Sequence, residues 1–110
     1  MQTNISASGL DLTSELRNHV EKRINHILYF CSRKIRSVHV RLFDRYSESG
    51  KPVKVSRVYA ELKGMPSIVA ESKSSDLYQA IHGSVHRAGK YIHKKLHRKK
   101  KRKLIQANRT

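Results

Sequence analysis

The spacing of apolar residues changes along this chain, and these changes constrain the fold more than any other feature of the sequence. Two segments place apolar residues three or four positions apart, as amphipathic helices do. They are residues 14–30 and the segment that begins at residue 77. Four segments alternate apolar and polar residues instead, as half-buried strands do. They are residues 2–8, 35–45, 55–64 and 67–72. The predicted order of elements is therefore β-α-β-β-β-α.

Each predicted helix has one apolar stripe that must be buried against another element. In the first helix, which Thr13 is suited to cap, the stripe comprises Leu16, Val20, Ile24, Ile27 and Leu28. In the second helix it comprises Leu77, Ala80, Ile81, Val85, Ala88, Ile92 and Leu96. The inward positions of the last three strands are Val38, Val40, Leu42, Val58, Ala60, Leu62, Ile68 and Ala70. We therefore predict an α+β fold, in which both helices pack on one face of a four-stranded sheet and the last three strands form an antiparallel meander.

Local signals mark the start of the second helix. Either Ser74 or Ser75 can cap it, and Asp76 suits its positive N-terminal end. Tyr78 follows near this cap, and we expect its ring to belong to the core. Two glycines lower the helix propensity by about 1 kcal/mol each, and they indicate close packing or the close approach of a partner. They are Gly83 and Gly89.

The length of 110 residues fits a single domain. We predict a folded domain at residues 1–98, followed by a basic, flexible tail at residues 99–110. No segment approaches the roughly 20 apolar residues of a membrane-spanning helix, and the polar opening MQTNISAS lacks the pattern of a signal peptide. The single cysteine, Cys31, excludes an intramolecular disulfide and suits a reducing compartment. We therefore expect the protein to be cytoplasmic.

Positive charge is concentrated in the last third of the chain. The formal net charge is +16, and residues 77–110 contain eleven Lys and Arg residues and no acidic residue. A charge distribution of this kind indicates a polyanionic partner, and nucleic acid is the first candidate. A membrane surface would also attract it, but the sequence contains no segment that would enter a bilayer.

The second predicted helix orders part of this charge. Arg87, Lys90, Lys94 and Arg98 are three or four positions apart, so they share one side of the helix, and Lys95 and Lys99 widen the row. Like charges at this spacing repel one another, and a phosphate backbone would neutralise them. The alternative is a solvated lysine face, but no acid interrupts the row. The segment KKKRK at residues 99–103 resembles a nuclear import signal, yet it directly continues this face, so we interpret it as further RNA contact or a flexible basic arm.

Other residue types offer little for catalysis or metal binding. Two histidine pairs at a spacing of four, His82 with His86 and His93 with His97, could bind zinc, but no Cys or acid lies among them to complete a site. We expect surface imidazoles that hydrogen-bond to phosphate or water. No general base is indicated near Cys31, and no paired catalytic acids, phosphate-binding loop or nucleophile motif is present. We predict a protein that is not an enzyme and that binds no metal or cofactor.

Two stretches, TSELRNHVEKRINHI and SSDLYQAIHGSVHRAGKYIHKK, together with the meander between them, resemble the short ribosome hibernation-promoting factor and ribosome-associated inhibitor (protein Y) family. The resemblance covers roughly residues 1–98. Its most specific part is the run from Asp76 to Tyr78, with Ala80, Ile81 and the basic series that follows. The chain departs from the family at His82 and His86, where acids are frequent, and at Leu96, where a basic residue is common.

The resemblance implies a layout similar to that of double-stranded-RNA-binding domains. It further implies binding in the decoding channel of the small ribosomal subunit, where the basic helices contact ribosomal RNA (rRNA) and exclude messenger and transfer RNA. Ribosomes are then preserved in an inactive state during stress or stationary phase. The residues implied as rRNA contacts are Arg17, Lys22, Arg23, Arg87, Lys90, Lys94, Lys95, Arg98 and Lys99. The expected partners are the small subunit and its rRNA, without a membrane or a small-molecule substrate, and we expect a monomer when the protein is free.

Three alternatives stay open at this point. The protein could be a general binder of structured RNA, which would hold free duplexes as well as ribosomes. It could be a permanent structural protein of the ribosome, or an enzyme acting on RNA. Whether it would block single ribosomes or assist their pairing is also open.

Overall fold

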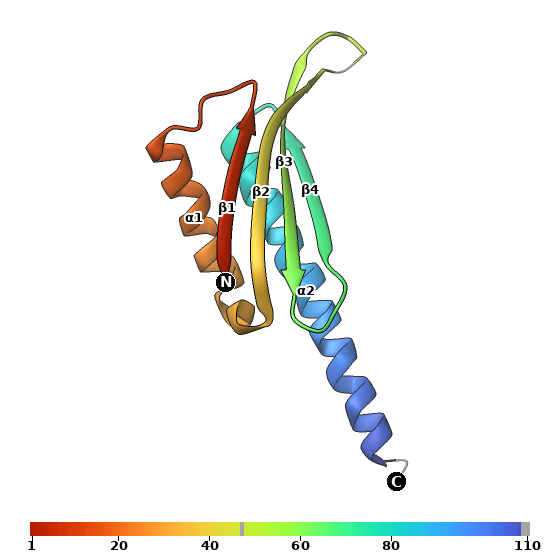
Figure 1. Ribbon diagram of the computed structural model, residues 1–110. Helices are drawn as coiled ribbons and strands as arrows, with labels where there is room; N and C mark the ends of the chain where they lie inside the picture. Colours follow the sequence, from red (N-terminus) through yellow and green to blue (C-terminus); the bar gives the residue numbers. More distant parts are fainter. Residues whose placement is uncertain (47, 109–110) are drawn as a thin grey trace.

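A computed structural model describes residues 1–46 and 48–108, and the side chains of residues 1–46 and 48–98. The elements are β1 (Gln2–Ser8), α1 (Ser14–Leu28), the 3₁₀ helix η1 (Tyr29–Lys34), β2 (Ile35–Tyr46), β3 (Pro52–Leu62), β4 (Ile68–Ser74) and α2 (Leu77–Asn108) (Figure 1). The predicted order β-α-β-β-β-α and the α+β class are confirmed. No helix in the described part of the chain combines the length and apolarity needed to cross a bilayer.

The four strands form one mixed sheet in the order β1-β2-β3-β4. As predicted, β2 pairs antiparallel with β3, and β3 pairs antiparallel with β4. β1 instead runs parallel to β2, from the pair Gln2–Ser37 to the pair Ser8–Phe43. A parallel pair requires a crossover connection, and α1 provides it. The sequence did not reveal this parallel pairing.

Both helices cover the same face of the sheet, and the core lies between the two layers (Figure 1). The predicted inward positions of β2, β3 and β4 are all buried, and so are most residues of the two helix stripes. At the ends of the α2 stripe, Leu77 and Leu96 are only partly buried. The alternation of β2 leaves its other side chains on the uncovered face of the sheet, which we call the open face.

α1 begins as predicted but ends earlier. The Thr13 Oγ1 accepts a hydrogen bond of 3.1 Å from the Leu16 amide and so caps the helix. The prediction that this helix extends to Phe30 is wrong, because α1 ends at Leu28 and the chain continues as η1. Cys31 within η1 has φ −124° and is buried. This kink leaves the two preceding aromatic side chains, Tyr29 and Phe30, 80% and 56% exposed.

The start of α2 corrects two predictions. Asp76, and neither Ser74 nor Ser75, caps the helix, because its Oδ1 accepts a 3.0 Å hydrogen bond from the Tyr78 amide. The Ser74 Oγ accepts a 3.2 Å bond from the Asp76 amide and so orients the capping residue. Tyr78 does not belong to the core: it is 44% exposed, and its ring lies against His19 of α1.

Two glycines allow α2 to lie close to its neighbours. A Cβ atom at Gly83 would be 2.5 Å from the Ser72 Oγ on β4, and one at Gly89 would be 3.1 Å from the Ile27 Cγ2 on α1. Both distances are shorter than ordinary contacts, so close packing of α2 accounts for both glycines.

α2 continues without a break past residue 98, where we predicted a boundary between the domain and its tail. The helix runs from Leu77 to Asn108 and projects beyond the end of the sheet (Figure 1). The predicted flexibility of residues 99–110 stays a prediction, and their side chains, including that of Lys99, lie outside the described residues.

Candidate nucleic-acid interface

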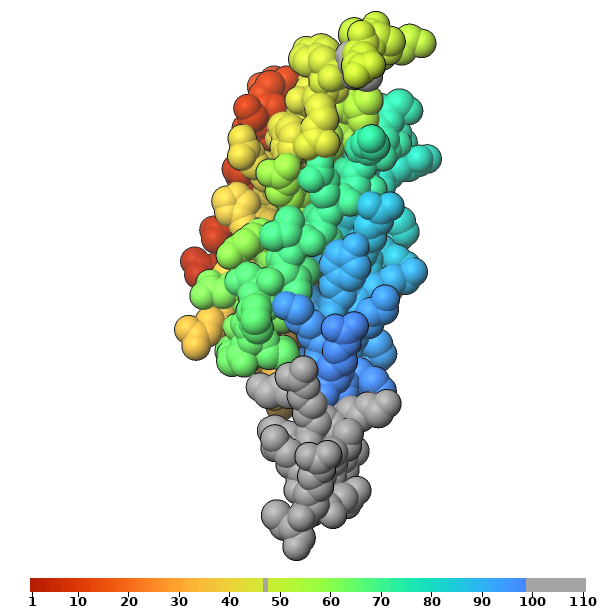
Figure 2. Space-filling view, turned by 90° about the vertical axis from the view of Figure 1, so that its right-hand side faces the viewer, coloured from red at the N-terminus to blue at the C-terminus, as the bar shows by residue number. Residues whose placement is uncertain are grey.

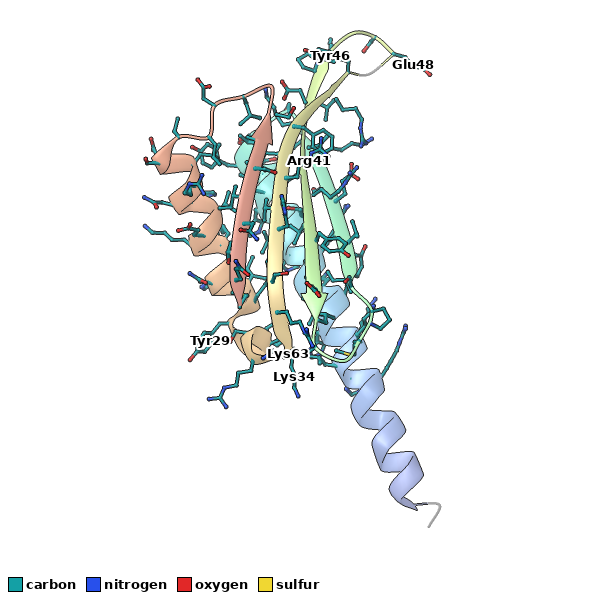
Figure 3. The ribbon with its side chains drawn as sticks, viewed as in Figure 1. Tyr29, Lys34, Arg41, Tyr46, Glu48 and Lys63 are labelled. Carbon is teal, nitrogen blue, oxygen red and sulfur yellow. The ribbon has the colours of Figure 1, made fainter. Side chains whose placement is uncertain are left out.

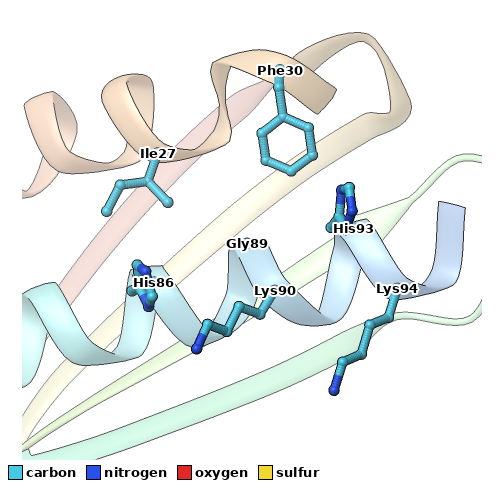
Figure 4. A pocket seen from close by; sticks show the side chains of 7 residues that line it. All are labelled: Ile27, Phe30, His86, Gly89, Lys90, His93 and Lys94. Atoms are coloured by element: carbon cyan, nitrogen blue, oxygen red, sulfur yellow. The ribbon is translucent and has the colours of Figure 1, made fainter. Parts of the chain in front are cut away.

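A groove runs between α1 and α2 on the outer side of the helix layer. One part of it, which we call the helix groove, has a volume of about 500 Å³. Its lining consists of Ile27, Phe30, His86, Gly89, Lys90, His93 and Lys94 (Figure 4). Gly89 has no side chain, so the floor of the groove lies close to Ile27. The residues that line the groove include no carboxylate.

The helix groove has an aromatic wall and a basic rim. Phe30 projects from η1 toward α2, and its ring centroid lies 6.1 Å from that of His93 in an edge-on arrangement (Figure 4). Lys90 and Lys94 are exposed and lie one turn apart on α2. Their side chains extend from α2 away from Phe30 (Figure 4). The groove therefore has an apolar interior and two exposed lysines along its α2 edge.

A second hollow continues the groove toward the start of α2. It is lined by His19, Arg23, Tyr78, Gln79, His82 and Gly83. The His19 and Tyr78 rings are 4.6 Å apart and nearly perpendicular. Burial lowers the pKa of His19 below its usual value, and the charges of Arg23, His82 and Lys22 lower it further.

The sequence-predicted residues of α1 separate into two groups. Lys22 and Arg23 line a shallow hollow with His19 and His26, so the structure places them beside the second hollow. Arg17 lines neither of these two hollows, nor does it line the helix groove. The α1 contribution to the basic surface is therefore centred on Lys22 and Arg23.

The cations of α2 form a row along its outer side, as the spacing predicts. We call Arg87, Lys90, Lys94 and Arg98 the cation row. Figure 2 shows this side of the molecule, with α2 in blue beside β4 in green (Figure 2). The Arg87 Nη1 donates a 2.7 Å hydrogen bond to the Glu71 carbonyl, and the neighbouring Lys95 Nζ donates a 3.0 Å bond to the Pro66 carbonyl. These two side chains are thereby held against the sheet.

The other three members of the cation row are available to a ligand. Lys90, Lys94 and Arg98 are exposed, and their side chains make no hydrogen bond or ion pair with any other described residue. Lys94 and Arg98 also line a hollow against β4 together with Tyr91. α2 contains no acidic residue that could balance this charge, so a polyanion would relieve the repulsion along the row.

Sequence reasoning missed a second basic cluster on the open face of the sheet. The guanidinium groups of Arg41, Arg45 and Arg57 lie 5.4, 5.7 and 5.2 Å from the centroid of the Phe43 ring. Figure 3 shows Arg41 on β2 (Figure 3). Arg41 and Arg57 alternate outward in the sequence, but only the strand register shows that they are cross-strand partners.

An acid on the open face balances much of this second cluster. Glu71 Oε1 lies 2.8 Å from Arg45 Nη2, and its Oε2 lies 3.3 Å from Arg57 Nη2. Glu61 adds a second carboxylate to this face and accepts a 3.3 Å hydrogen bond from the Ser37 hydroxyl. The helix layer, where the grooves carry no carboxylate, is therefore the better surface for a polyanion.

The remaining reactive groups do not form a catalytic arrangement. Burial raises the pKa of the Cys31 thiol to about 11, so it is protonated at neutral pH. Its Sγ donates a 3.5 Å hydrogen bond to the Leu28 carbonyl. In each histidine pair of α2 the rings are stacked, with centroids 6.1 and 6.4 Å apart. Across the described side chains, no group of three or more His, Cys, Asp or Glu residues could hold a metal ion.

Known proteins share this fold, and a family model matches most of the chain. A family model described as sigma 54 modulation protein / S30EA ribosomal protein matches residues 3–102. A ribosomal subunit interface protein from Coxiella burnetii has a similar structure, with a TM-score of 0.72 and 22% identity over 86% of this chain and 96% of that chain. The protein Y N-terminal domain from Thermus thermophilus has a TM-score of 0.68 and 20% identity over 84% of this chain and 96% of that chain. A comparison with curated proteins finds no match. At these identities the two structures show the fold alone.

Proposed function

Because the chain belongs to the sigma 54 modulation protein / S30EA ribosomal protein family, a family of ribosome-associated hibernation factors, we propose that it binds the small ribosomal subunit and keeps ribosomes inactive. In this proposal the outer side of the helix layer lies on rRNA in the decoding channel. The protein then occupies the space that messenger and transfer RNA need. It acts in the cytoplasm, during stress or stationary phase.

The observation that carries this proposal is the cation row on a helix without acidic residues. Phosphate contacts fix the position of a protein on RNA without reading its sequence. Three exposed members of the row are unpaired among the described residues, so they are free to make such contacts. Lys22 and Arg23 extend the basic surface onto α1. The proposed rRNA contacts are Arg17, Lys22, Arg23, Arg87, Lys90, Lys94, Lys95, Arg98 and Lys99.

The proposed mechanism is physical exclusion, and it involves no chemical step. Specificity would come from the fit of the helix layer to the shape of the rRNA, because phosphate contacts alone carry no sequence information. The name of one similar structure, a ribosomal subunit interface protein, supports a ribosomal partner.

Co-sedimentation with purified small subunits tests the proposal. We expect the protein to pellet with empty subunits and to be displaced when messenger RNA and initiator transfer RNA are bound first. If the protein pellets equally well with filled subunits, it does not occupy the decoding channel. If it binds free RNA duplexes as tightly as subunits, it is a general binder of structured RNA.

Charge removal tests the proposed surface. Replacing Lys90, Lys94 and Arg98 together with Ala should abolish subunit binding while the fold is retained. A matched control removes the same charge from Lys34, Lys63 and Lys73, which are exposed and lie outside the helix groove and the cation row. Figure 3 labels the first two of these lysines (Figure 3). The control variant should bind like the wild type. Binding by a folded triple variant of the cation row would show that the interface lies elsewhere.

A further inference from the structure

We propose that the helix groove holds one unpaired nucleotide of the bound RNA, with its base against Phe30 and its phosphates on Lys90 and Lys94. This inference rests on the proposed function, since it assumes that the helix layer faces RNA. The proposed function uses the cation row for contacts to phosphates alone. The nucleotide site adds a contact to one base.

The interior of the groove suits a base better than it suits a phosphate. Ile27, Phe30 and Gly89 contribute apolar surface and main chain, and none of them can neutralise a phosphate (Figure 4). A volume of about 500 Å³ lies within the range of roughly 300–1,000 Å³ that is typical of small-molecule sites. A flat aromatic ligand with an attached negative charge therefore matches the groove.

Phe30 is placed as a stacking platform. An aromatic side chain at the end of an amphipathic helix is normally buried, but the kink in η1 leaves Phe30 56% exposed. Its ring faces α2 across the groove, and His93 contacts it edge-on at 6.1 Å. Unpaired bases stack on exposed aromatic rings of this kind in many RNA-binding proteins.

The polar groups around the groove can read and hold the rest of a nucleotide. His86 and His93 offer ring nitrogens that donate or accept hydrogen bonds at a base edge. Lys90 and Lys94 are roughly 6 Å apart along the helix axis, and their exposed side chains extend from the α2 edge of the groove. A lysine side chain is long and flexible, so both can turn to the phosphates of a nucleotide bound at this edge. Because two lysines and no carboxylate line the groove, an anionic ligand is favoured over a cationic one.

The test compares two RNA hairpins that differ in a single base. One hairpin carries a one-nucleotide bulge, and the other carries an abasic residue at the same position, so both have the same phosphates. Fluorescence anisotropy with the full chain should show about tenfold tighter binding to the hairpin with the base, the size expected for one stacked base. Equal affinity of the wild-type protein for both hairpins would overturn the inference.

Two variants separate stacking from charge. Phe30→Ala should remove the preference for the base while the dependence of binding on salt stays unchanged, because no cation is lost. The matched control is Tyr29→Ala, since Tyr29 is 80% exposed, adjacent in sequence and absent from the groove lining. It should keep the preference. A preference that survives Phe30→Ala would place the base elsewhere and overturn the inference.

Co-sedimentation with small subunits keeps this inference distinct from the proposed function. Phe30→Ala should weaken subunit binding about tenfold, and Tyr29→Ala should leave it unchanged. If both variants bind subunits like the wild type, the nucleotide site is wrong while ribosome binding stands. If the wild-type protein does not bind subunits at all, the proposed function itself fails.

Discussion

Burial and nearby positive charge both lower the pKa of the His19 imidazole. Burial lowers its pKa, and Arg23, His82 and Lys22 lower it further. Tyr78 contacts its ring edge-on from α2. In the unfolded chain the imidazole has a pKa of about 6.5, so as the pH falls the unfolded chain takes up this proton before the folded protein does. A lowered pKa therefore makes the folded state less stable below about pH 6.5, and the loss stops once the pH is below the folded-state value.

We predict that His19→Gln reduces the loss of stability between pH 7 and pH 5. The reason is that Gln carries no proton in either state, so this contribution to the pH dependence disappears. Urea unfolding at several pH values measures it as the free energy of unfolding. His39→Gln serves as the control, because His39 lies on the open face of the sheet and away from the basic residues of the helix layer. An unchanged pH profile in His19→Gln would contradict the prediction.

Cys31 should be slow to react as long as the protein is folded. It is 2% exposed, and burial raises its pKa to about 11, so the reactive thiolate is scarce at pH 8. We expect iodoacetamide to label the native protein at least tenfold more slowly than the urea-unfolded protein, as followed by mass spectrometry. Equal rates would show that η1 opens readily and exposes the thiol.

At the scale of the elements, the sequence predicted which residues of a strand or helix face the core more reliably than which elements are neighbours. The alternation of β2, seen in Val38, Val40 and Leu42, gave the buried face of the sheet correctly because burial repeats every second residue. The parallel pairing of β1 with β2 was not visible, since periodicity carries no information on strand direction. The pattern also could not place Tyr78 against His19, because the periodicity of one helix carries no information on which part of the other helix lies beside it.

The candidate site was predictable only in part. Helical spacing correctly placed the cation row on one side of α2, because that geometry is local. The helix groove depends on two elements that are distant in the sequence, and on the kink that exposes Phe30. Phe30 does not belong to the predicted apolar stripe of the first helix, and no local signal indicated its place in the groove.

The contact of α2 with β3 includes one buried polar pair. Ser84 and Ser56 are fully buried, and the Ser84 Oγ lies 2.8 Å from the Ser56 Oγ and 2.9 Å from the Ile81 carbonyl oxygen. A hydroxyl has one proton, so Ser84 donates to Ile81 and accepts from Ser56, which satisfies both side chains.

We predict that Ser84→Ala destabilises the protein by about 1–3 kcal/mol, because the Ser56 hydroxyl is left buried without this partner. Adding Ser56→Ala should recover part of that loss, since the unsatisfied group is then removed. Urea unfolding of the two single variants and the double variant gives the coupling energy. Additive effects would show that the two hydroxyls do not depend on each other.

At the scale of the whole molecule, α2 is longer than the sheet that supports it. Its 32 residues correspond to about 48 Å at 1.5 Å per residue, and the longest dimension of the molecule is 59 Å. Among the α2 side chains that the structure describes, which end at Arg98, Ile92 is the last that is fully buried, and Leu96 is partly buried. The stability of the fold should therefore not depend on residues 99–110.

We predict that deleting residues 99–110 leaves the thermal unfolding temperature unchanged but weakens subunit binding several-fold. The deletion removes six Lys and Arg residues and leaves the cation row intact. The logarithm of the binding constant should then fall less steeply with the logarithm of the salt concentration, because fewer counterions are released. Complete loss of binding at low salt would show that the C-terminal segment makes the main contact.

The hydrogen bonds that α2 makes to the main chain of the sheet also bear on self-association. β4 is an edge strand, and the exposed main-chain groups of such a strand can pair with a second copy of the chain. Arg87 occupies the Glu71 carbonyl on this edge, and Lys95 occupies the Pro66 carbonyl in the turn before it. These two carbonyls are therefore not free to pair with a second copy of the chain. To bind a phosphate, Arg87 and Lys95 would each have to break one of these hydrogen bonds and leave a carbonyl near the sheet edge unpaired.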